Sequence, residues 1–165
     1  MDQDLYSKSQ AAKLLGITPR TIHYYTDLGL VVPKINPTGK GTTRWYSVGN
    51  LFELMFIKEL ASSGISLESI KYVIDQLSRR VDSPIDFNLT YNVGTRTYLL
   101  ILDWHTDHAR AFTITPNESG MVEFGLHEAF KAMVVDITRI WESVANATGS
   151  QEAKHYVDLV SLKSD

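Results

Sequence analysis

The spacing of apolar residues changes once along the chain, near residue 82. Before that point apolar residues recur every three or four positions, which is the period of an amphipathic helix. After it they alternate with polar residues, which is the period of a half-buried strand. We therefore predict an α+β protein with two domains, residues 1–82 and 83–165. The helices predicted in the first domain are 8–15, 19–28, 48–63 and 67–80.

Start and stop signals bound the first two helices closely. Ser7 and Thr18 are helix-capping residues, and Pro19 occupies a first helical position, where its missing N–H does no harm. Gly16 ends the first helix and Gly29 ends the second. Because only two residues separate Gly16 from Pro19, the pattern predicts a helix, a tight turn and a second helix, that is, a helix-turn-helix. Ser47 and Ser66 cap the two later helices.

Residues 31–46 (VVPKINPTGKGTTRWY) contain two prolines and two glycines, so they do not favour a helix. We predict an extended hairpin whose tip, residues 37–41, is flexible and basic. A helix-turn-helix followed by such a hairpin is a winged-helix arrangement, in which the second helix enters the major groove and the wing reaches adjacent backbone or the minor groove.

The charge distribution supports a polyanionic partner for this segment. Residues 5–50 contain six cations and the single acid Asp27, inside a chain whose formal net charge is −3. A basic surface that is merely solvated is the alternative that charge alone leaves open. The cations are Lys8, Lys13, Arg20, Lys34, Lys40 and Arg44.

The predicted second helix has two distinct faces. By helical spacing, Ile22 and Tyr25 face the first helix. The outer face then carries Arg20, Thr21, His23, Tyr24 and Asp27. A tyrosine hydroxyl donates hydrogen bonds to phosphate oxygens, and an arginine at the helix N-terminus can reach a base edge or a phosphate.

Three stretches of the chain resemble the N-terminal domain of the MerR family of bacterial transcription regulators. They are SKSQAAKLLGITPRTIHYYTDLGLVVP, TTRWYSVGNL and FIKELASSGISLESIKYVI, all within residues 5–80. The resemblance implies base-region contacts from Arg20 and Thr21, phosphate contacts from Tyr24 and Tyr25, and a wing arginine at Arg44. We expect a DNA-binding surface made of these residues and of Lys8, His23, Lys40 and Trp45.

The chain departs from the family pattern in two places near the tyrosine pair. His23 stands where the family usually has arginine, and Thr26 stands where it often has an acid. A histidine is mostly uncharged at neutral pH, so the grip on phosphate is expected to be weaker or sensitive to pH. The resemblance also implies dimers on palindromic promoter DNA, with RNA polymerase as a candidate partner. The family's dimer helix directly after this domain is missing, because the fourth predicted helix stops near Arg80.

The C-terminal half is predicted to be a small antiparallel meander sheet followed by a long helix. The predicted strands are 86–93, 96–104, 109–115 and 121–124, with 96–104 central, and the helix is 126–147, with a short final helix around 151–162. The apolar residues of the predicted helix 126–147 follow a heptad pattern, which favours a dimer seam. Packing of the stripe on the helix's own sheet is the alternative, and both can hold. The seam residues are Phe130, Met133, Ile137, Ile140, Trp141 and Val144.

Other chemistry finds little support in the sequence. The chain has no cysteine, and His105, Asp107 and His108 lie in a predicted hairpin loop, so we expect no metal and no cofactor. An aromatic set either lines a pocket for a small-molecule effector or fills the core, and we favour the core. That set is Tyr98, Trp104, Phe112, Phe124 and Trp141. No phosphate-binding loop, dinucleotide fingerprint or nucleophile elbow is present, so we do not expect an enzyme.

The favoured interpretation is therefore a sequence-specific DNA-binding transcriptional regulator that acts as a homodimer. Because no stretch is long and apolar enough for a membrane span, we expect it to be cytoplasmic and nucleoid-associated. Two alternatives stay open. One is an architectural or segregation protein with the same DNA reader; the other is a protein-interaction module whose MerR-like fold no longer reads DNA.

Overall fold

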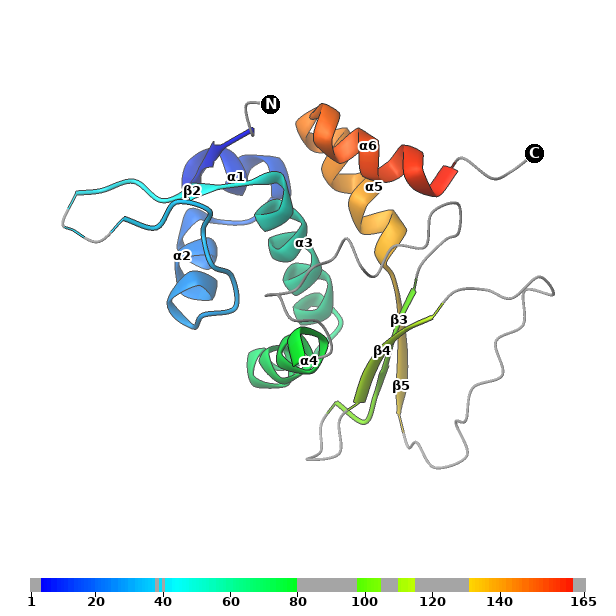
Figure 1. Cartoon of the computed structure of the whole chain (residues 1–165). Helices are drawn as coiled ribbons and strands as arrows, with labels where there is room; N and C mark the ends of the chain where they lie inside the picture. Colours follow the sequence, from blue (N-terminus) through cyan, green and yellow to red (C-terminus); the bar gives the residue numbers. More distant parts are fainter. Residues whose placement is uncertain are drawn as a thin grey trace. The chain divides into compact units, whose positions relative to one another are not determined.

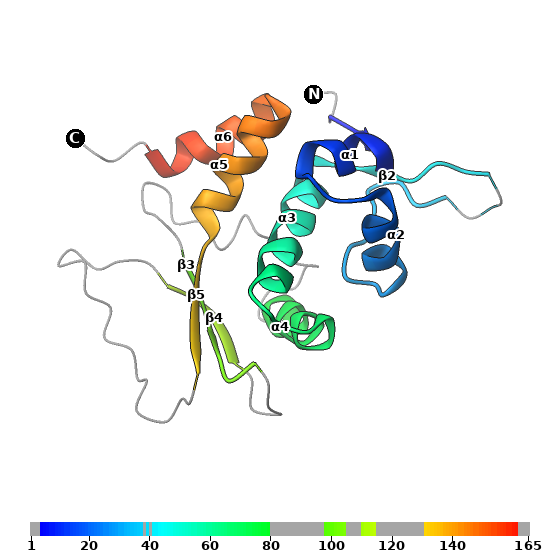
Figure 2. The same cartoon turned by 180° about the vertical axis from the view of Figure 1, so that it is seen from behind.

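The computed structural model describes residues 4–37, 39, 41–79, 98–104, 110–114 and 131–161 of the chain (Figures 1 and 2). It contains α-helices and two small antiparallel sheets. The chain divides into two compact units, one formed by Met1–Lys58 with Ile140–Tyr156 and the other by Glu59–Arg139 with Val157–Asp165. The domain boundary predicted near residue 82 lies outside the described residues and stays a prediction.

The first unit begins with the predicted helix pair. Helix α1 (Lys8–Leu15) starts at a capping box, in which the Ser7 hydroxyl accepts from the Gln10 N–H while the Gln10 side chain accepts from the Ser7 N–H. It ends at Gly16, whose φ of 62° is left-handed. Helix α2 (Pro19–Asp27) starts at Thr18, whose hydroxyl accepts from the Thr21 N–H at 3.0 Å. Both predicted helices are confirmed, and α2 ends at Asp27, one residue before its predicted end.

The two helices pack against each other through small and apolar side chains. Residues Ala11 and Leu15 of α1 and Ile22 and Tyr25 of α2 are all buried. Strand β1 (Tyr6–Ser7), just before α1, pairs antiparallel with β2 (Trp45–Tyr46), which follows the extended loop (Figure 1). The loop between α2 and β2 therefore leaves α2 and returns beside the start of α1.

Helix α3 (Val48–Ser62) is apolar nearly all round, which is typical of a helix at the centre of a core. One of its buried rings, Phe52, stacks on Trp141 of helix α5 (Ile137–Thr148), with ring centroids 4.4 Å apart. This contact explains why the segment from residue 140 belongs to the first unit. The side chains of α3 with no exposed surface are Val48, Leu51, Phe52, Leu54, Phe56, Ile57 and Leu60.

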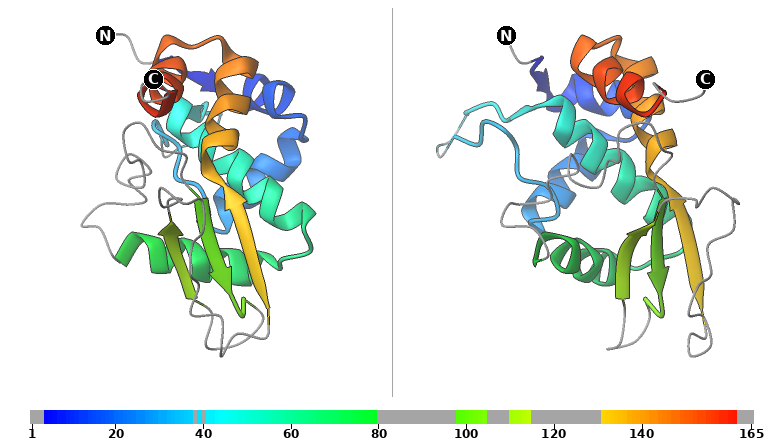
Figure 3. Two further views of the ribbon diagram at one scale, coloured as in Figure 1. Left: turned by 90° about the vertical axis from the view of Figure 1, so that its right-hand side faces the viewer. Right: turned by 45° about the vertical axis from the view of Figure 1, so that its right-hand side comes forward.

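The second unit contains helix α4 (Leu67–Arg79) and a three-stranded sheet. The Ser66 hydroxyl caps α4 by accepting from the Ser69 N–H, as predicted. The strands are β3 (Tyr98–Leu102), β4 (Arg110–Ile114) and β5 (Ala132–Asp136), in the order β4-β3-β5 (Figure 3). The central position predicted for the strand at 96–104 is confirmed, and α4 lies against β4.

Two predictions for the C-terminal half are wrong. The sheet is not a meander, because β5 pairs with the central β3 rather than with β4. The long helix from 126 does not form over residues 132–136, which are strand β5 and include Met133. The adjacent β-branched residues Val134 and Val135 favour a strand, and Asp136 then caps α5 by accepting from the Arg139 N–H at 2.9 Å.

The remaining predictions for this half divide between tested and untested. The short final helix is confirmed as α6 (Gln151–Ser161). The predicted strands at 86–93 and 121–124, and Phe130 of the predicted seam, lie outside the described residues. Among the residues that are described, no helix is long and apolar enough to cross a membrane.

Candidate nucleic-acid interface

Helix α2 has one buried face and one exposed face, as its spacing predicts. Ile22 is fully buried, and the Thr26 hydroxyl on the same side donates to the Ile22 carbonyl at 2.8 Å. On the other side Arg20 is exposed, and His23 and Tyr24 are each about half exposed. The exposed face therefore carries a guanidinium and a phenol, which can donate hydrogen bonds to phosphate or base edges, and an imidazole between them.

The adjacent tyrosines have different environments. Tyr24 is 54% exposed, whereas Tyr25 is 7% exposed. Desolvation by burial raises the pKa of the Tyr25 phenol above its usual 10, so its hydroxyl keeps its proton and remains a donor. The prediction that Tyr25 faces the core is confirmed.

The loop from 31 to 44 is held as a hairpin at its base. Ile35 and Trp45 exchange two backbone hydrogen bonds of 3.1 and 3.0 Å, and the half-buried Trp45 continues into β2. Nearer the tip, the Thr42 hydroxyl donates to the Gly39 carbonyl at 2.8 Å. The predicted hairpin is confirmed at its base, and Lys40 at its tip lies outside the described residues.

The side chain of Asn50, on α3, forms hydrogen bonds with the backbone at both ends of this loop. Its amide nitrogen donates to the Val32 carbonyl, and its amide oxygen accepts from the backbone N–H groups of Lys34 and Ser47, at distances of 2.9 to 3.2 Å. The amide nitrogen also donates to the carboxyl group of Glu53 at 2.9 Å. Burial of that carboxyl raises the pKa of Glu53 to about 7. Asn50 and Glu53 were not predicted, because no local pattern marks a contact across 16 to 18 residues.

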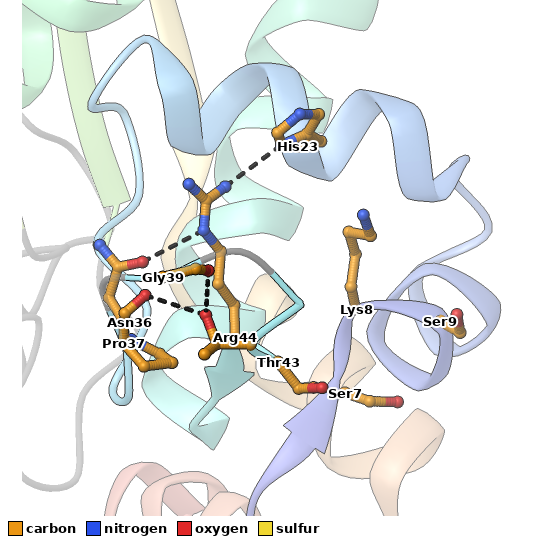
Figure 4. A pocket seen from close by; sticks show the side chains of 10 residues that line it. Ser7, Lys8, Ser9, His23, Asn36, Pro37, Gly39, Thr43 and Arg44 are labelled. Atoms are coloured by element: carbon orange, nitrogen blue, oxygen red, sulfur yellow. Dashed lines mark hydrogen bonds between the residues drawn. The ribbon is translucent and has the colours of Figure 1, made fainter.

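Arg44, the predicted wing arginine, is bound to the face of α2. Its Nη1 lies 3.2 Å from the Asp27 carboxylate. The same Nη1 lies 3.2 Å from Nδ1 of His23, and Nε donates to the Asn36 side chain at 3.1 Å (Figure 4). The Nε2 of His23 is in turn 3.4 Å from the Asp27 carboxylate. Asp27 and Asn36 are partners that the predicted DNA-binding set omitted, although Asp27 was correctly placed on the outer face.

A polar hollow of about 710 Å³ lies beside this cluster, between the start of α1, α2 and the loop. Figure 4 shows Lys8 on one side of it and Arg44 on the other, with His23 on α2. The hydroxyl-bearing residues Ser7, Ser9, Thr42 and Thr43 also line it. The structure thus brings Lys8, His23 and Arg44 of the predicted set together. The half-buried Thr21 lies beside Arg20 in the first turn of α2.

The residues predicted as a dimer seam are mostly buried within the chain itself. Ile137, Ile140, Trp141 and Val144 are each no more than 5% exposed, and Met133 is half-buried on β5. Intramolecular packing, the alternative for this stripe, accounts for the burial of the four α5 residues. Dimerisation itself stays a prediction.

The other candidate sites remain without structural support. Within the described ranges, no group of three or more His, Cys, Asp or Glu residues is placed to hold a metal ion. His105, Asp107, His108 and Phe124 lie outside those ranges, and the side chain of Phe112 is not described. Of the aromatic set, Trp141 packs on Phe52 in the core, and Tyr98 and Trp104 are half-buried.

Two helices joined by a tight turn, with a polar face on the second and a basic hairpin bound to it, define a helix-turn-helix protein. Comparison with known families agrees with this class. Residues 6–77 match the model of the MerR HTH family regulatory proteins. The segment is therefore similar to the MerR family, and the resemblance seen in the sequence is confirmed over residues 6–77.

Individual relatives share the same segment. Over 94 residues the chain is 33% identical to the uncharacterized HTH-type transcriptional regulator Rv1830 of Mycobacterium tuberculosis, covering 56% of this chain and 42% of the relative. It is 35% identical over 68 residues to the HTH-type transcriptional regulator CueR of Bacillus subtilis, covering 41% of this chain and 46% of CueR. The chain spans less than half the length of these relatives, and both are named as transcriptional regulators.

Proposed function

We propose that this chain is a sequence-specific DNA-binding transcriptional regulator, whose winged helix-turn-helix reads palindromic promoter DNA as a dimer. The observation that carries the proposal is the exposed face of α2, where Arg20, His23 and Tyr24 lie on the same helix to which Arg44 of the hairpin is bound. The match of residues 6–77 to a family of regulatory proteins supports the same function. Dimerisation and contact with RNA polymerase are proposed from the family resemblance.

The proposed contacts follow from the chemistry of these side chains and from the family resemblance. Arg20 and Thr21, in the first turn of α2, face base edges. The Tyr24 and Tyr25 hydroxyls donate to phosphates, with the Tyr25 ring anchored in the core. Arg44 and Trp45 contact backbone from the hairpin. Lys8 lies across the polar hollow, and Lys40 completes the predicted set.

The test is a titration of duplex affinity against salt concentration. We expect the logarithm of the association constant to fall linearly with the logarithm of salt, by about 0.9 per phosphate that a cation neutralises. Fluorescence anisotropy of a labelled duplex measures this slope. A folded protein that shows no duplex binding at low salt, or binding that salt does not weaken, would contradict the proposal.

Replacing Arg20 with alanine distinguishes base recognition from phosphate binding. We expect Arg20→Ala to weaken binding to a preferred duplex by about 1–3 kcal/mol, and to weaken binding to a scrambled duplex much less, because a base contact discriminates and a phosphate contact does not. Anisotropy on the two duplexes measures the difference. Lys154→Ala, which removes an exposed cation on α6, is the matched control and should leave the ratio of the two affinities unchanged.

A further inference from the structure

Asp27 is the single acid among residues 5–50, and it lies on the face of α2 proposed to meet DNA. A half-exposed carboxylate at that place repels a phosphate backbone. In the structure it contacts two groups at once, Nη1 of Arg44 at 3.2 Å and Nε2 of His23 at 3.4 Å. A negative charge at position 27 opposes the proposed binding to DNA. The contacts of Asp27 with Arg44 and His23 give a reason for its presence there.

The hydrogen-bond chemistry of the cluster assigns a role to each nitrogen. A guanidinium only donates, so where Arg44 Nη1 meets His23 Nδ1 at 3.2 Å, Nδ1 is the acceptor and carries no proton. The ring proton then sits on Nε2 and points to Asp27. Asp27 and His23 thus present two acceptors to Nη1 of Arg44, four residues apart on one face of α2.

Two of the three guanidinium nitrogens of Arg44 are already hydrogen-bonded within this cluster. Its Nε donates to Asn36, and its Nη1 donates to Asp27 and His23. Within the part of the chain that the structure describes, Nη2 has no hydrogen-bond partner. Because Nε and Nη1 are held, the guanidinium presents Nη2 to DNA in one fixed orientation, whereas an arginine without these contacts samples many orientations.

We propose that His23 and Asp27 together form a receptor on the recognition helix for Arg44, which fixes the hairpin to α2 so that both read DNA as one rigid surface. In this arrangement His23 and Asp27 are positioning residues, and Arg44 meets a phosphate that sets the register of α2 on the base edges. Loss of that register weakens binding to a preferred duplex, whereas a scrambled duplex has no preferred register to lose. The inference rests on the proposed function and deepens it. A permanent cation at position 23 would place donors and positive charge against Arg44, so a neutral ring with an acceptor is what this receptor requires.

Positioning and simple electrostatics predict opposite outcomes for the loss of the carboxylate. If Asp27 were only a charge, Asp27→Asn would tighten binding to every duplex alike. If Asp27 holds Arg44 in place, the same change weakens binding to the preferred duplex while binding to a scrambled duplex is unchanged or tighter. We expect the ratio of the two affinities to fall about tenfold, as for the loss of one or two charge-assisted hydrogen bonds.

The experiment compares four variants of the full chain by anisotropy on a preferred and a scrambled duplex. Asp27→Asn and His23→Lys should each lower the affinity ratio about tenfold, since one removes the carboxylate and the other removes the acceptor. His23→Gln keeps an acceptor and a donor and should lower the ratio less than His23→Lys does. Glu59→Gln, which neutralises an exposed acid on α3, is the control for charge alone. Thermal unfolding should be similar for all four variants.

An unchanged ratio in Asp27→Asn, with tighter binding to both duplexes, would overturn the inference and leave the proposed function intact. Absence of duplex binding by the wild-type protein would overturn the proposed function instead. The contact itself is measured in the free protein, through the Nη–H resonances of Arg44, because Nη1 is the nitrogen that meets Asp27 and His23. Those resonances should be protected from solvent exchange in the wild type and should lose protection in Asp27→Asn. Equal protection in the two proteins would contradict the receptor.

Discussion

Replacing Trp141 with alanine is expected to lower the free energy of unfolding by about 3–5 kcal/mol, the range for truncating a large aromatic residue in a core. Trp141 is 2% exposed, and its ring stacks on Phe52 of α3 at a centroid distance of 4.4 Å. The change leaves a cavity beside α3 and removes one of the stacking partners of Phe52. Urea unfolding followed by circular dichroism measures the difference.

This substitution also separates the two interpretations of helix α5. If Trp141 packs within its own chain, the loss of stability is the same at all protein concentrations. If it lies in a dimer seam, the loss depends on concentration and comes with a lower oligomeric mass. Lys154→Ala, on the exposed surface of α6, is the control. A loss below about 1 kcal/mol for Trp141→Ala, far under the range for core aromatic residues, would contradict the packing of α5 on α3.

Glu53→Gln is expected to stabilise the protein above neutral pH by up to about 3 kcal/mol, given a shift of the carboxyl pKa from 4.5 to about 7. Because burial raises the pKa of Glu53, the folded protein keeps a proton on this carboxyl between about pH 4.5 and pH 7, where the unfolded chain has released it. The wild-type protein therefore loses stability as the pH rises from about 4.5 to about 7, and the loss is complete above that range. Glutamine keeps an oxygen to accept from Asn50 and carries no charge.

Urea unfolding of both proteins at several pH values between 4.5 and 8 measures this effect. The two stability curves should lie close together near pH 4.5 and diverge with rising pH, the wild type falling below the variant. Glu59→Gln, at an exposed position of the same helix, should follow the wild type. Parallel curves for the wild type and Glu53→Gln would show that the carboxyl group of Glu53 is not buried against the loop.

The helices of the N-terminal segment were predictable because their signals are local. Ser7, Thr18 and Ser66 each cap a helix through a hydrogen bond to an N–H three residues ahead, and Gly16 supplies the left-handed turn between α1 and α2. The division of the tyrosine pair into an exposed and a buried ring followed from helical spacing alone. Such signals act within one turn of helix and can be read in sequence order.

The errors and omissions come from contacts between distant residues. The heptad spacing over 126–147 gives no sign that residues 132–136 pair with β3, 30 to 38 positions earlier in the chain. In the site, Arg44 was predicted, but its partner Asp27 lies 17 residues before it. Likewise Asn50 reaches back 18 residues to Val32. Periodicity indicates which face of a helix or strand is buried, but it does not indicate which other element packs against that face.

The central claim, that the exposed face of α2 reads DNA, is tested most directly by selecting binding sites from a pool of random duplexes. The protein should enrich a single motif, and Arg20→Ala should lose selectivity at specific positions of that motif while the protein still binds duplex at low salt. A palindromic motif would support binding as a dimer. Failure of the folded protein to enrich any sequence over the starting pool would contradict the claim.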